Sequence, residues 1–231
     1  MQHESGNERI NIAIDGPAGA GKSTVAKKVA ELLGYVYIDT GAMYRAVALA
    51  AYRSGVDAAD GDRIARLLET LKIALYPGPD GQRVCIDGED ATAAIRSREV
   101  TLRVSQVASH ERVRLRLVEM QRALAASKGA VMDGRDIGSH VLPHAELKVF
   151  LTASVKVRAA RRFSESGAEQ GVSLEQLERE IVERDRADAQ RVHSPLVRAS
   201  DAKLLDSTDL SIEQVVEQIV AWSRTKLAEA K

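Results

Sequence analysis

The sequence has few aromatic residues, a single cysteine and no long apolar run. Aromatic residues make up 3% of the 231 positions, so we do not expect the stacking surfaces that bind single-stranded nucleic acid. Cys85 is the only cysteine, which excludes an internal disulfide and a cysteine-rich zinc site. Its neighbours Val84 and Ile86 indicate a buried strand. No apolar run approaches the length of a membrane span.

The chain also lacks an excess of charge of either sign. It has 33 Lys and Arg residues and 33 Asp and Glu residues, and its formal net charge is zero. Nothing therefore indicates a nucleic acid or a membrane surface as a partner. The first nine residues are polar and lack the apolar region of a signal peptide. We expect a cytoplasmic protein, and no exposed apolar stripe demands a dimer, so we expect a monomer.

What the sequence does contain is a complete P-loop pattern, GxxxxGK[ST], at residues 16–23. An apolar strand pattern at 10–14 precedes it, and a helical pattern from Thr24 to Leu33 follows it. The glycines allow backbone N–H groups to face a phosphate at the start of the helix. A glycine-rich turn that fits the pattern by chance is the alternative. We predict that a phosphate donor binds at Gly16, Pro17, Ala18, Gly19, Ala20, Gly21, Lys22, Ser23 and Thr24.

Strand and helix patterns alternate along the rest of the chain. Four further apolar runs indicate strands at 35–38, 130–132, 147–151 and 203–205. With the strand before the P-loop they predict an α/β fold, a five-stranded parallel sheet flanked by helices, as in P-loop NTPases. Ligands bind such sheets beyond the carboxyl ends of the strands. The P-loop, residues 39–41 and residues 133–136 should all lie there.

Residues 62–98 interrupt this alternation. Leu71–Tyr76 and Arg83–Asp87 both have strand patterns, and the six residues between them are rich in Gly and Pro. They predict an antiparallel hairpin with a loop of residues 77–82. Helices are expected to follow at about 99–109 and 111–126.

Two acidic residues after strands have alternative interpretations. Asp133 follows the apolar run 130–132, as an aspartate that organises Mg²⁺ does in P-loop enzymes, or it simply forms a turn. We predict Ser23 and Asp133 as the metal site. Asp39 either serves the site or only ends its strand. The histidines form no cluster with the spacing of metal ligands.

Three further motifs specify what the P-loop serves. They are DTGAMYR at 39–45, GRDIG at 134–138 and ERDRADAQR at 183–191. Together with the P-loop, and in this order, they resemble those of bacterial cytidylate kinases over about 10–227. The resemblance implies transfer of phosphate from ATP, with Mg²⁺, to CMP or dCMP. It also implies a core (10–61, 99–153 and 192–231), a nucleotide-binding insert (about 62–98) and a lid (about 154–191), after a flexible tail (1–9).

The resemblance also implies roles for individual residues. The acceptor phosphate would be held by Thr40, Arg45, Arg135 and Arg191. The cytosine would contact Ser105, Arg114 and Asp136, and the ribose would contact Arg184 and Asp188. On the lid, Arg158, Arg161 and Arg162 would close over the donor phosphates. We predict that the catalytic residues are Lys22, Arg135, Arg161 and Arg162. We also predict that Arg158 is a further residue that binds the donor.

Helical spacing gives independent support to the last of these motifs. Positions 174, 177, 181, 184, 188 and 191 fall on one helix face, apolar in its first half and charged in its second. A helix that packs on the protein and then enters a ligand cleft has this pattern, whereas a helix that leaves the core for solvent is the alternative.

Other classes of P-loop protein fit the sequence less well. A kinase for AMP, UMP or dephospho-coenzyme A is the nearest alternative, and Asp136 with Arg114 favours cytosine over these. A GTPase switch normally requires an NKxD motif, but both asparagines of this chain, Asn7 and Asn11, precede the P-loop. A mechanical ATPase would require a signature helix or an arginine finger, and neither is evident.

Overall fold

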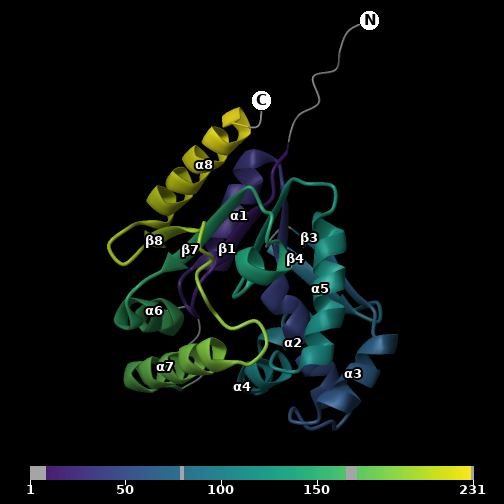
Figure 1. The fold of residues 1–231 in the computed structure, drawn as a ribbon. Helices are drawn as coiled ribbons and strands as arrows, with labels where there is room; N and C mark the ends of the chain where they lie inside the picture. The colour runs from purple at the N-terminus through teal and green to yellow at the C-terminus, as the bar shows by residue number, and fades with distance from the viewer. Residues whose placement is uncertain (1–8, 79–80, 165–170, 230–231) are drawn as a thin grey trace, which may run out of the picture.

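Two sheets and eight α-helices make up the described part of this computed structural model, which covers residues 9–78, 81–164 and 171–229 (Figure 1). The larger sheet has five strands in the order β2-β6-β1-β7-β8, and every neighbouring pair is parallel. Its strands are β1 (Ile12–Asp15), β2 (Val36–Asp39), β6 (Ala130–Gly134), β7 (Leu147–Thr152) and β8 (Lys203–Asp206). The predicted α/β fold and all five strands are confirmed.

Helices cover both faces of the central sheet because successive residues of β1 point to opposite sides. Ile12 and Ile14 belong to an apolar cluster that includes residues of α1 (Lys22–Leu33) and α8 (Ile212–Glu229). Ala13, between them, belongs to the cluster on the other face, with residues of α5 (Glu111–Ala125). β1 is thus buried on both sides, which fixes the P-loop that follows it.

The P-loop requires glycine where its chain folds tightly. Gly16 has a φ of +149°, and a Cβ there would lie 1.9 Å from the carbonyl oxygen of Leu151 in β7. Gly21, which precedes α1, has a φ of +82° in the left-handed region. A larger residue at Gly16 would push the loop away from the sheet.

The insert contains more structure than its sequence pattern predicted. The hairpin is present as β3 (Ile73–Gly78) and β4 (Gly81–Ile86), and a short strand, β5 (Glu89–Asp90), extends it. The predicted six-residue loop is wrong, because the strands continue through 78 and from 81; residues 79–80 lie outside the described part. Pro77 pairs with Gln82 inside the hairpin. Proline is tolerated there because β3 is an edge strand.

Helix α3 (Gly61–Thr70) lies directly before the hairpin and was not predicted. The Asp60 carboxylate caps it by accepting from the Arg63 N–H at 3.0 Å. Ile64 and Leu68 are buried in a cluster shared with α2 (Thr40–Arg53), β4, α4 (Arg98–Val107) and α5. The insert is therefore packed against the helices that carry part of the site.

Helices α6 (Val155–Arg162) and α7 (Leu174–Gln190) form a separate unit, on one side of the molecule in Figure 1. Their apolar residues form a small cluster of their own, made of Ala159, Val172, Leu177 and Ile181 with Val155 against it. Residues 165–170 lie outside the described part, as do residues 1–8 of the predicted tail.

No helix of the described ranges combines the length and the apolar character needed to cross a membrane.

Candidate active site

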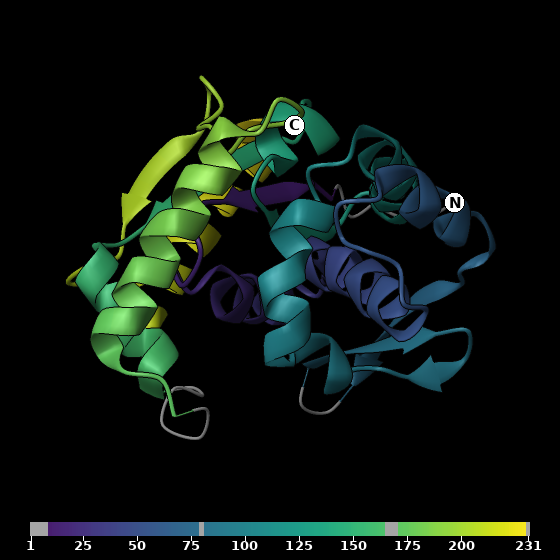
Figure 2. The same ribbon diagram turned by 90° about the horizontal axis from the view of Figure 1, so that it is seen from below.

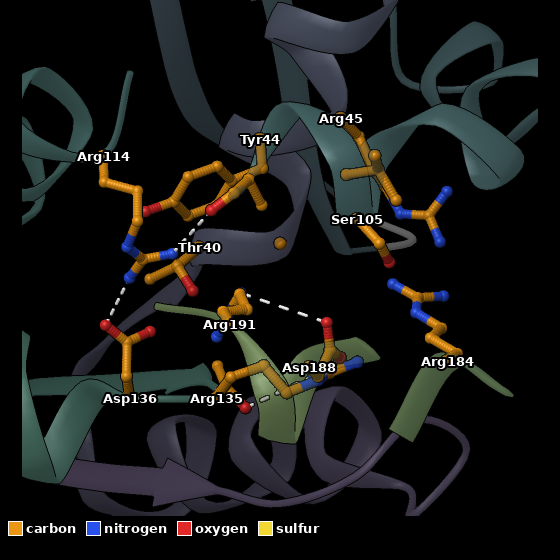
Figure 3. Close-up of a pocket in the computed structure, with 14 residues that line it drawn as sticks. Thr40, Tyr44, Arg45, Ser105, Arg114, Arg135, Asp136, Arg184, Asp188 and Arg191 are labelled. Carbon is orange, nitrogen blue, oxygen red and sulfur yellow. Dashed lines mark hydrogen bonds and ion pairs between the residues drawn. The ribbon is translucent and has the colours of Figure 1, made fainter. Parts of the chain in front are cut away.

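Helix α7 lies across from α2 and α4 in the ribbon (Figure 2). A pocket lined by these helices and by the start of α5 gathers the residues of three motifs (Figure 3). The loop after β6 forms its floor. It lies beyond the carboxyl ends of the parallel strands, where ligands bind such sheets. Every residue predicted to bind the acceptor lines this pocket: Thr40, Arg45, Ser105, Arg114, Arg135, Asp136, Arg184, Asp188 and Arg191.

One end of the pocket is formed by a buried ion pair. The guanidinium of Arg114, on α5, donates to the Asp136 carboxylate, and both side chains are at most 6% exposed (Figure 3). Arg114 also donates to the Ala108 carbonyl at 3.1 Å and lies 5.4 Å from the centre of the Tyr44 ring. A charge pair held on several sides keeps a fixed orientation. This end of the pocket offers fixed donors and acceptors to a polar ring.

Asp188 organises the opposite side. Its carboxylate accepts from Arg135 Nε at 2.9 Å and lies 4.0 Å from Arg191 Nη1 (Figure 3). Burial alone would raise the pKa of Asp188, but the guanidinium groups of Arg135, Arg184 and Arg191 bring it below its usual range. The carboxylate thus stays charged and holds the guanidinium groups in place.

The pocket is lined by more guanidinium groups than carboxylates. Within the described chain, Nε and Nη2 of Arg191 and Nε of Arg184 are buried without a hydrogen-bond partner. Burial, together with the charge of neighbouring arginines, lowers the pKa of Arg184 to about 9 and that of Arg45 to about 10. Both groups remain protonated at neutral pH, but holding them together costs free energy. An anion in the pocket would remove that cost.

Thr40 and Arg45 project from the start of α2, at the end of β2. The Asp39 carboxylate accepts from the Ala42 N–H at 2.8 Å and so caps this helix. Thr40 Oγ1 donates to the carbonyl oxygen of Asp133 at 2.7 Å, which ties α2 to the end of β6. Arg45 donates to the Ile95 carbonyl and the Thr101 hydroxyl. Asp39 therefore does more than end a strand.

Beside this pocket, the P-loop brings a cation and a hydroxyl next to a buried carboxylate. Lys22 Nζ donates to the Pro17 carbonyl inside the loop at 2.7 Å. Asp133 accepts from Ser23 Oγ and from Tyr37 Oη, each at 2.9 Å. Burial raises the pKa of Asp133 and lowers that of Lys22. These two residues act on each other's charge, as a cation-binding and phosphate-binding pair would.

A second pocket lies on the other side of the P-loop. It is lined by the first turns of α1, by Leu210, Ile212 and Val215 near α8, and by Arg161 of α6. Arg161 donates to the hydroxyl and to the carbonyl oxygen of Ser207, at 3.1 and 2.8 Å. One wall of this pocket is thus apolar and the other is a fixed guanidinium.

The other two arginines of α6 differ from each other. Arg158 is 5% exposed and donates to the carbonyls of Ala18 and Ala153 and to the Asp185 carboxylate. It braces the back of the P-loop, and its predicted contact with donor phosphates stays a prediction. Arg162 is among the charges that lower the pKa of Arg45 and Arg184, so it is within electrostatic reach of the first pocket.

Sequence reasoning missed several residues that hold the site. Asp185 accepts from the Ala18 N–H of the P-loop at 3.3 Å as well as from Arg158. Tyr37 fixes Asp133, and Asp15 accepts two backbone N–H groups of the loop after β6. The position of Asp15 at the carboxyl end of β1 was a sufficient signal. The hydroxyl of Tyr37 had no such signal.

Comparison with known proteins gives sequence matches over most of the chain. The family model for cytidylate kinase matches residues 12–225. The cytidylate kinase of Shouchella clausii is 54% identical over 213 residues, which are 91% of this chain and 94% of the relative. That of Geobacillus kaustophilus is 55% identical over 213 residues, 92% of this chain and 95% of the relative.

A solved structure shares the fold at low identity. An uncharacterised protein from Eubacterium ventriosum superposes with a TM-score of 0.51 at 13% identity, over 94% of this chain and 99% of the other. That likeness concerns the fold alone. The sequence matches span nearly the whole of both proteins and include every motif that lines the first pocket, and on these grounds the chain belongs to the cytidylate kinase family.

Proposed function

We propose that the protein transfers the γ-phosphate of ATP to CMP or dCMP, giving CDP or dCDP and ADP. The observation that carries this proposal is the first pocket, which joins a buried Arg114–Asp136 pair at one end to several buried guanidinium groups at the other. A nucleoside monophosphate has matching ends, a polar base and a dianionic phosphate. Membership of the cytidylate kinase family supports the choice of base.

The Arg114–Asp136 pair accounts for a preference for cytosine. Cytosine carries an amino group at its 4-position, and uracil carries a carbonyl group there. An ionised Asp136 accepts from the amino group and repels the carbonyl oxygen, while Arg114 and Ser105 are placed to donate to the acceptors of the ring. With uracil, the buried carboxylate would face a hydrogen-bond acceptor. This unfavourable contact contributes more to discrimination than the favourable contact with cytosine does.

The ribose and the phosphate belong at the arginine-rich side. Arg184 and Asp188 would hold the ribose hydroxyls, and Thr40, Arg45, Arg135 and Arg191 would hold the phosphate. The buried N–H groups of Arg184 and Arg191 that have no partner within the described chain support this assignment. Because Arg135 and Arg191 already lie beside Asp188, binding requires little rearrangement of them.

The donor nucleotide belongs on the other side of the P-loop. Residues 16–24 would bind its phosphates, and the second pocket would hold its base between Arg161 and the apolar side chains near α8. Arg161 and Arg162 would supply positive charge from α6, and Arg158 would keep the P-loop in place. The two phosphates then meet at Lys22, between the two pockets.

A magnesium ion fits the oxygen groups present beside Lys22. Mg²⁺ prefers hard oxygen ligands and is usually bound by one or two carboxylates together with substrate phosphates. Asp133 and Ser23 offer a buried carboxylate and a hydroxyl 2.9 Å apart, with Tyr37 holding the second carboxylate oxygen. Bound there, Mg²⁺ would neutralise charge on the transferring phosphate.

Positioning and charge neutralisation are sufficient for this reaction. The acceptor phosphate is mostly dianionic at neutral pH, since its second pKa is about 6, and needs no general base. The difficulty is the approach of two groups of like charge, and Lys22 with Arg135 and Arg191 reduces it.

We also propose that residues 62–98 form the nucleotide-binding insert and that residues 154–191 form a lid. The apolar cluster of this second segment is separate from the others, which suits movement as a unit.

The direct test is to measure ADP formation from ATP and Mg²⁺ with AMP, GMP, UMP, CMP and dCMP in turn. The proposal predicts rapid turnover with CMP and dCMP and little with the others. Equal turnover with AMP or GMP would reject the assignment of the first pocket.

A further inference from the structure

Asp15 is a buried carboxylate without a role in the reaction as proposed. It is the last residue of β1 and is 5% exposed. Oδ1 accepts from the Ile137 N–H and Oδ2 accepts from the Gly138 N–H, both at 2.7 Å. These are the first two amides of the short helical turn Ile137–Val141, and they directly follow Asp136. One side chain thus holds the backbone beside the residue that faces the base.

The rest of that turn is fixed by Asp136 itself. The carbonyl oxygen of Asp136 accepts from the N–H groups of His140 and Val141, at 2.9 and 3.1 Å. These bonds are internal to the turn, whereas Asp15 reaches its first two amides from β1. At the other end of the turn, Arg122 of α5 donates to the carbonyl oxygens of His140 and Val141, at 2.8 and 2.9 Å. Of these contacts from outside the turn, the one beside Asp136 is made by Asp15.

A neutral side chain could cap this turn at lower cost. The pKa of the Asp15 carboxyl is raised to about 6, mainly by burial and in part by the nearby charge of Asp136, although the amides of Gly138 and Ile137 and the charge of Lys22 act in the opposite direction. A carboxylate that is buried beside another carboxylate is unfavourable for folding. Its advantage is geometric, since its two equivalent oxygens accept from two adjacent amides at once.

The turn packs closely against the side chains of Asp15 and Lys148. A Cβ on Gly138 would lie 3.3 Å from Oδ2 of Asp15 and 3.1 Å from Cδ of Lys148. Gly134, which pairs with Asp15 across β1 and β6, would place a Cβ 2.6 Å from Ile137. Side chains at these two glycines would therefore crowd the contacts that hold the turn beside β1.

We infer that Asp15 is a positioning residue for base selection: it fixes the backbone of Asp136 and so sets how closely that carboxylate meets the 4-amino group of the acceptor base. The inference rests on the proposed function. Asp15 also immediately precedes Gly16, so it joins the strand that carries the donor loop to the turn that carries the base contact. It touches neither pocket and acts only through the backbone of 136–138.

The test is the Asp15→Asn variant, assayed for kcat and KM with CMP, UMP and ATP. An asparagine retains one acceptor but turns an NH₂ group toward the second amide. We expect kcat/KM for CMP to fall about tenfold, the loss of one charged hydrogen bond, and the ratio of kcat/KM for CMP to that for UMP to fall with it. KM for ATP should change less than about twofold, because the P-loop bonds are untouched. Asp57→Asn, whose exposed side chain precedes α3 and lies outside the proposed insert, is the matched control.

A second variant covers the case in which Asp15→Asn does not fold. Gly138→Ala leaves Asp15 in place but displaces the turn, and it should lower the ratio of CMP to UMP in the same direction. A folded Asp15→Asn protein with an unchanged ratio overturns the inference, as does a KM for ATP that rises in parallel with KM for CMP.

The failure of the proposed function would look different. If the unmodified protein does not prefer CMP to UMP, both the proposed function and this inference are overturned. If Asp136→Asn narrows the preference and Asp15→Asn does not, the inference alone is wrong.

Discussion

Several ionisable side chains of this protein are buried, although such side chains usually lie at the protein surface. Asp15, Lys22, Asp133 and Asp188 are each at most 5% exposed. Each one faces either backbone amides or a charge of opposite sign. Burial of this kind costs stability, and all four residues lie at the carboxyl edge of the sheet or in the first pocket. For these four residues, the cost is thus incurred at the site.

Asp15 makes this cost measurable. Its pKa rises from 3.8 to about 6 on folding, so between about pH 4 and pH 6 the folded protein holds a proton that the unfolded chain releases. Stability therefore decreases as pH rises through this window and stays lower above it. Relative to Asp15→Asn, wild-type protein should lose on the order of 2 to 3 kcal/mol between pH 4 and pH 7. Urea denaturation of both proteins at the two pH values measures this, and a difference that does not change with pH contradicts it.

Lys22→Ala should leave a folded protein that transfers phosphate at least about 10²-fold more slowly, because a fixed charge between donor and acceptor is lost. The comparison is Lys28→Ala on the same helix, whose side chain is 46% exposed and faces Glu213 at 3.7 Å. That control should retain normal turnover. Similar turnover of the two variants would exclude Lys22 from the reaction.

At the scale of elements, helix α7 changes character along its length. Leu177 and Ile181 are buried in the cluster shared with α6, whereas Arg184, Asp188 and Arg191 line the first pocket. The residue that ends the helix, Arg191, is a full member of the site. The charged half of the predicted face lines a pocket, and Leu177 and Ile181 of its apolar half are buried, whereas Leu174 at its start is 37% exposed.

Arg191→Ala should weaken CMP binding and lower kcat, with kcat/KM reduced about ten- to hundredfold by the loss of charged hydrogen bonds. Asp188 is left paired with Arg135, so no buried carboxylate loses its last partner. Arg179→Ala, on the exposed side of the same helix, should be nearly silent. Steady-state kinetics with CMP as the varied substrate test this prediction. Small effects of equal size for the two variants would show that α7 does not bind the acceptor.

One side chain of the hairpin β3–β4 is hydrogen-bonded to the backbone of β2 in the central sheet. Gln82 accepts from the Asp39 N–H at 3.0 Å and donates to the Tyr37 carbonyl at 2.7 Å, as a further strand beside β2 would. Gln82→Ala should lower stability by about 1 to 3 kcal/mol and speed amide exchange at Asp39. Arg83→Ala, whose exposed side chain pairs only with Asp90 in the described chain, should do neither. Hydrogen exchange and urea denaturation test this, and a protected Asp39 amide in the variant would contradict it.

Elements could be predicted where a pattern is local. The central strands carry continuous apolar runs, and the P-loop has its own signature, so both were found. The length of the hairpin does not follow from the sequence pattern, because Pro77 and Gly78 are typical of turns although an edge strand tolerates them. Helix α3 had a usable signal, the Asp60 cap followed by Ile64, Leu67 and Leu68, but it lay within a segment interpreted only as strands.

The sequence predicted which residues form the site, but it did not predict the hydrogen bonds and ion pairs between them. The motifs named the residues that line the first pocket, because side chains that follow parallel strands converge at one edge. The pairing of Asp188 with Arg135, and that of Asp133 with Tyr37, join elements distant in the sequence. Spacing along one chain contains no information on such contacts. The same limit hid the role of Arg158, which faces the P-loop backbone from α6.

At the scale of the whole molecule, one pocket lies on each side of the P-loop. The first is built by α2, α4, α5 and α7 and the loop after β6, and the second by α1, α6 and the start of α8. Lys22, at the beginning of α1, stands between them. The parallel sheet makes this arrangement possible, since β1 lies at its centre with β6 and β7 on either side.

The central claim is that the Arg114–Asp136 end of the first pocket selects cytosine, and the ratio of kcat/KM for CMP to that for UMP tests it most directly. The unmodified protein should prefer CMP by up to about 10⁴-fold, because uracil leaves the buried Asp136 carboxylate facing an acceptor. Asp136→Asn, which can donate to the uracil carbonyl, should narrow that ratio, mainly by loss of activity with CMP. A ratio near one for the unmodified protein, or a ratio that the substitution leaves unchanged, would contradict the account.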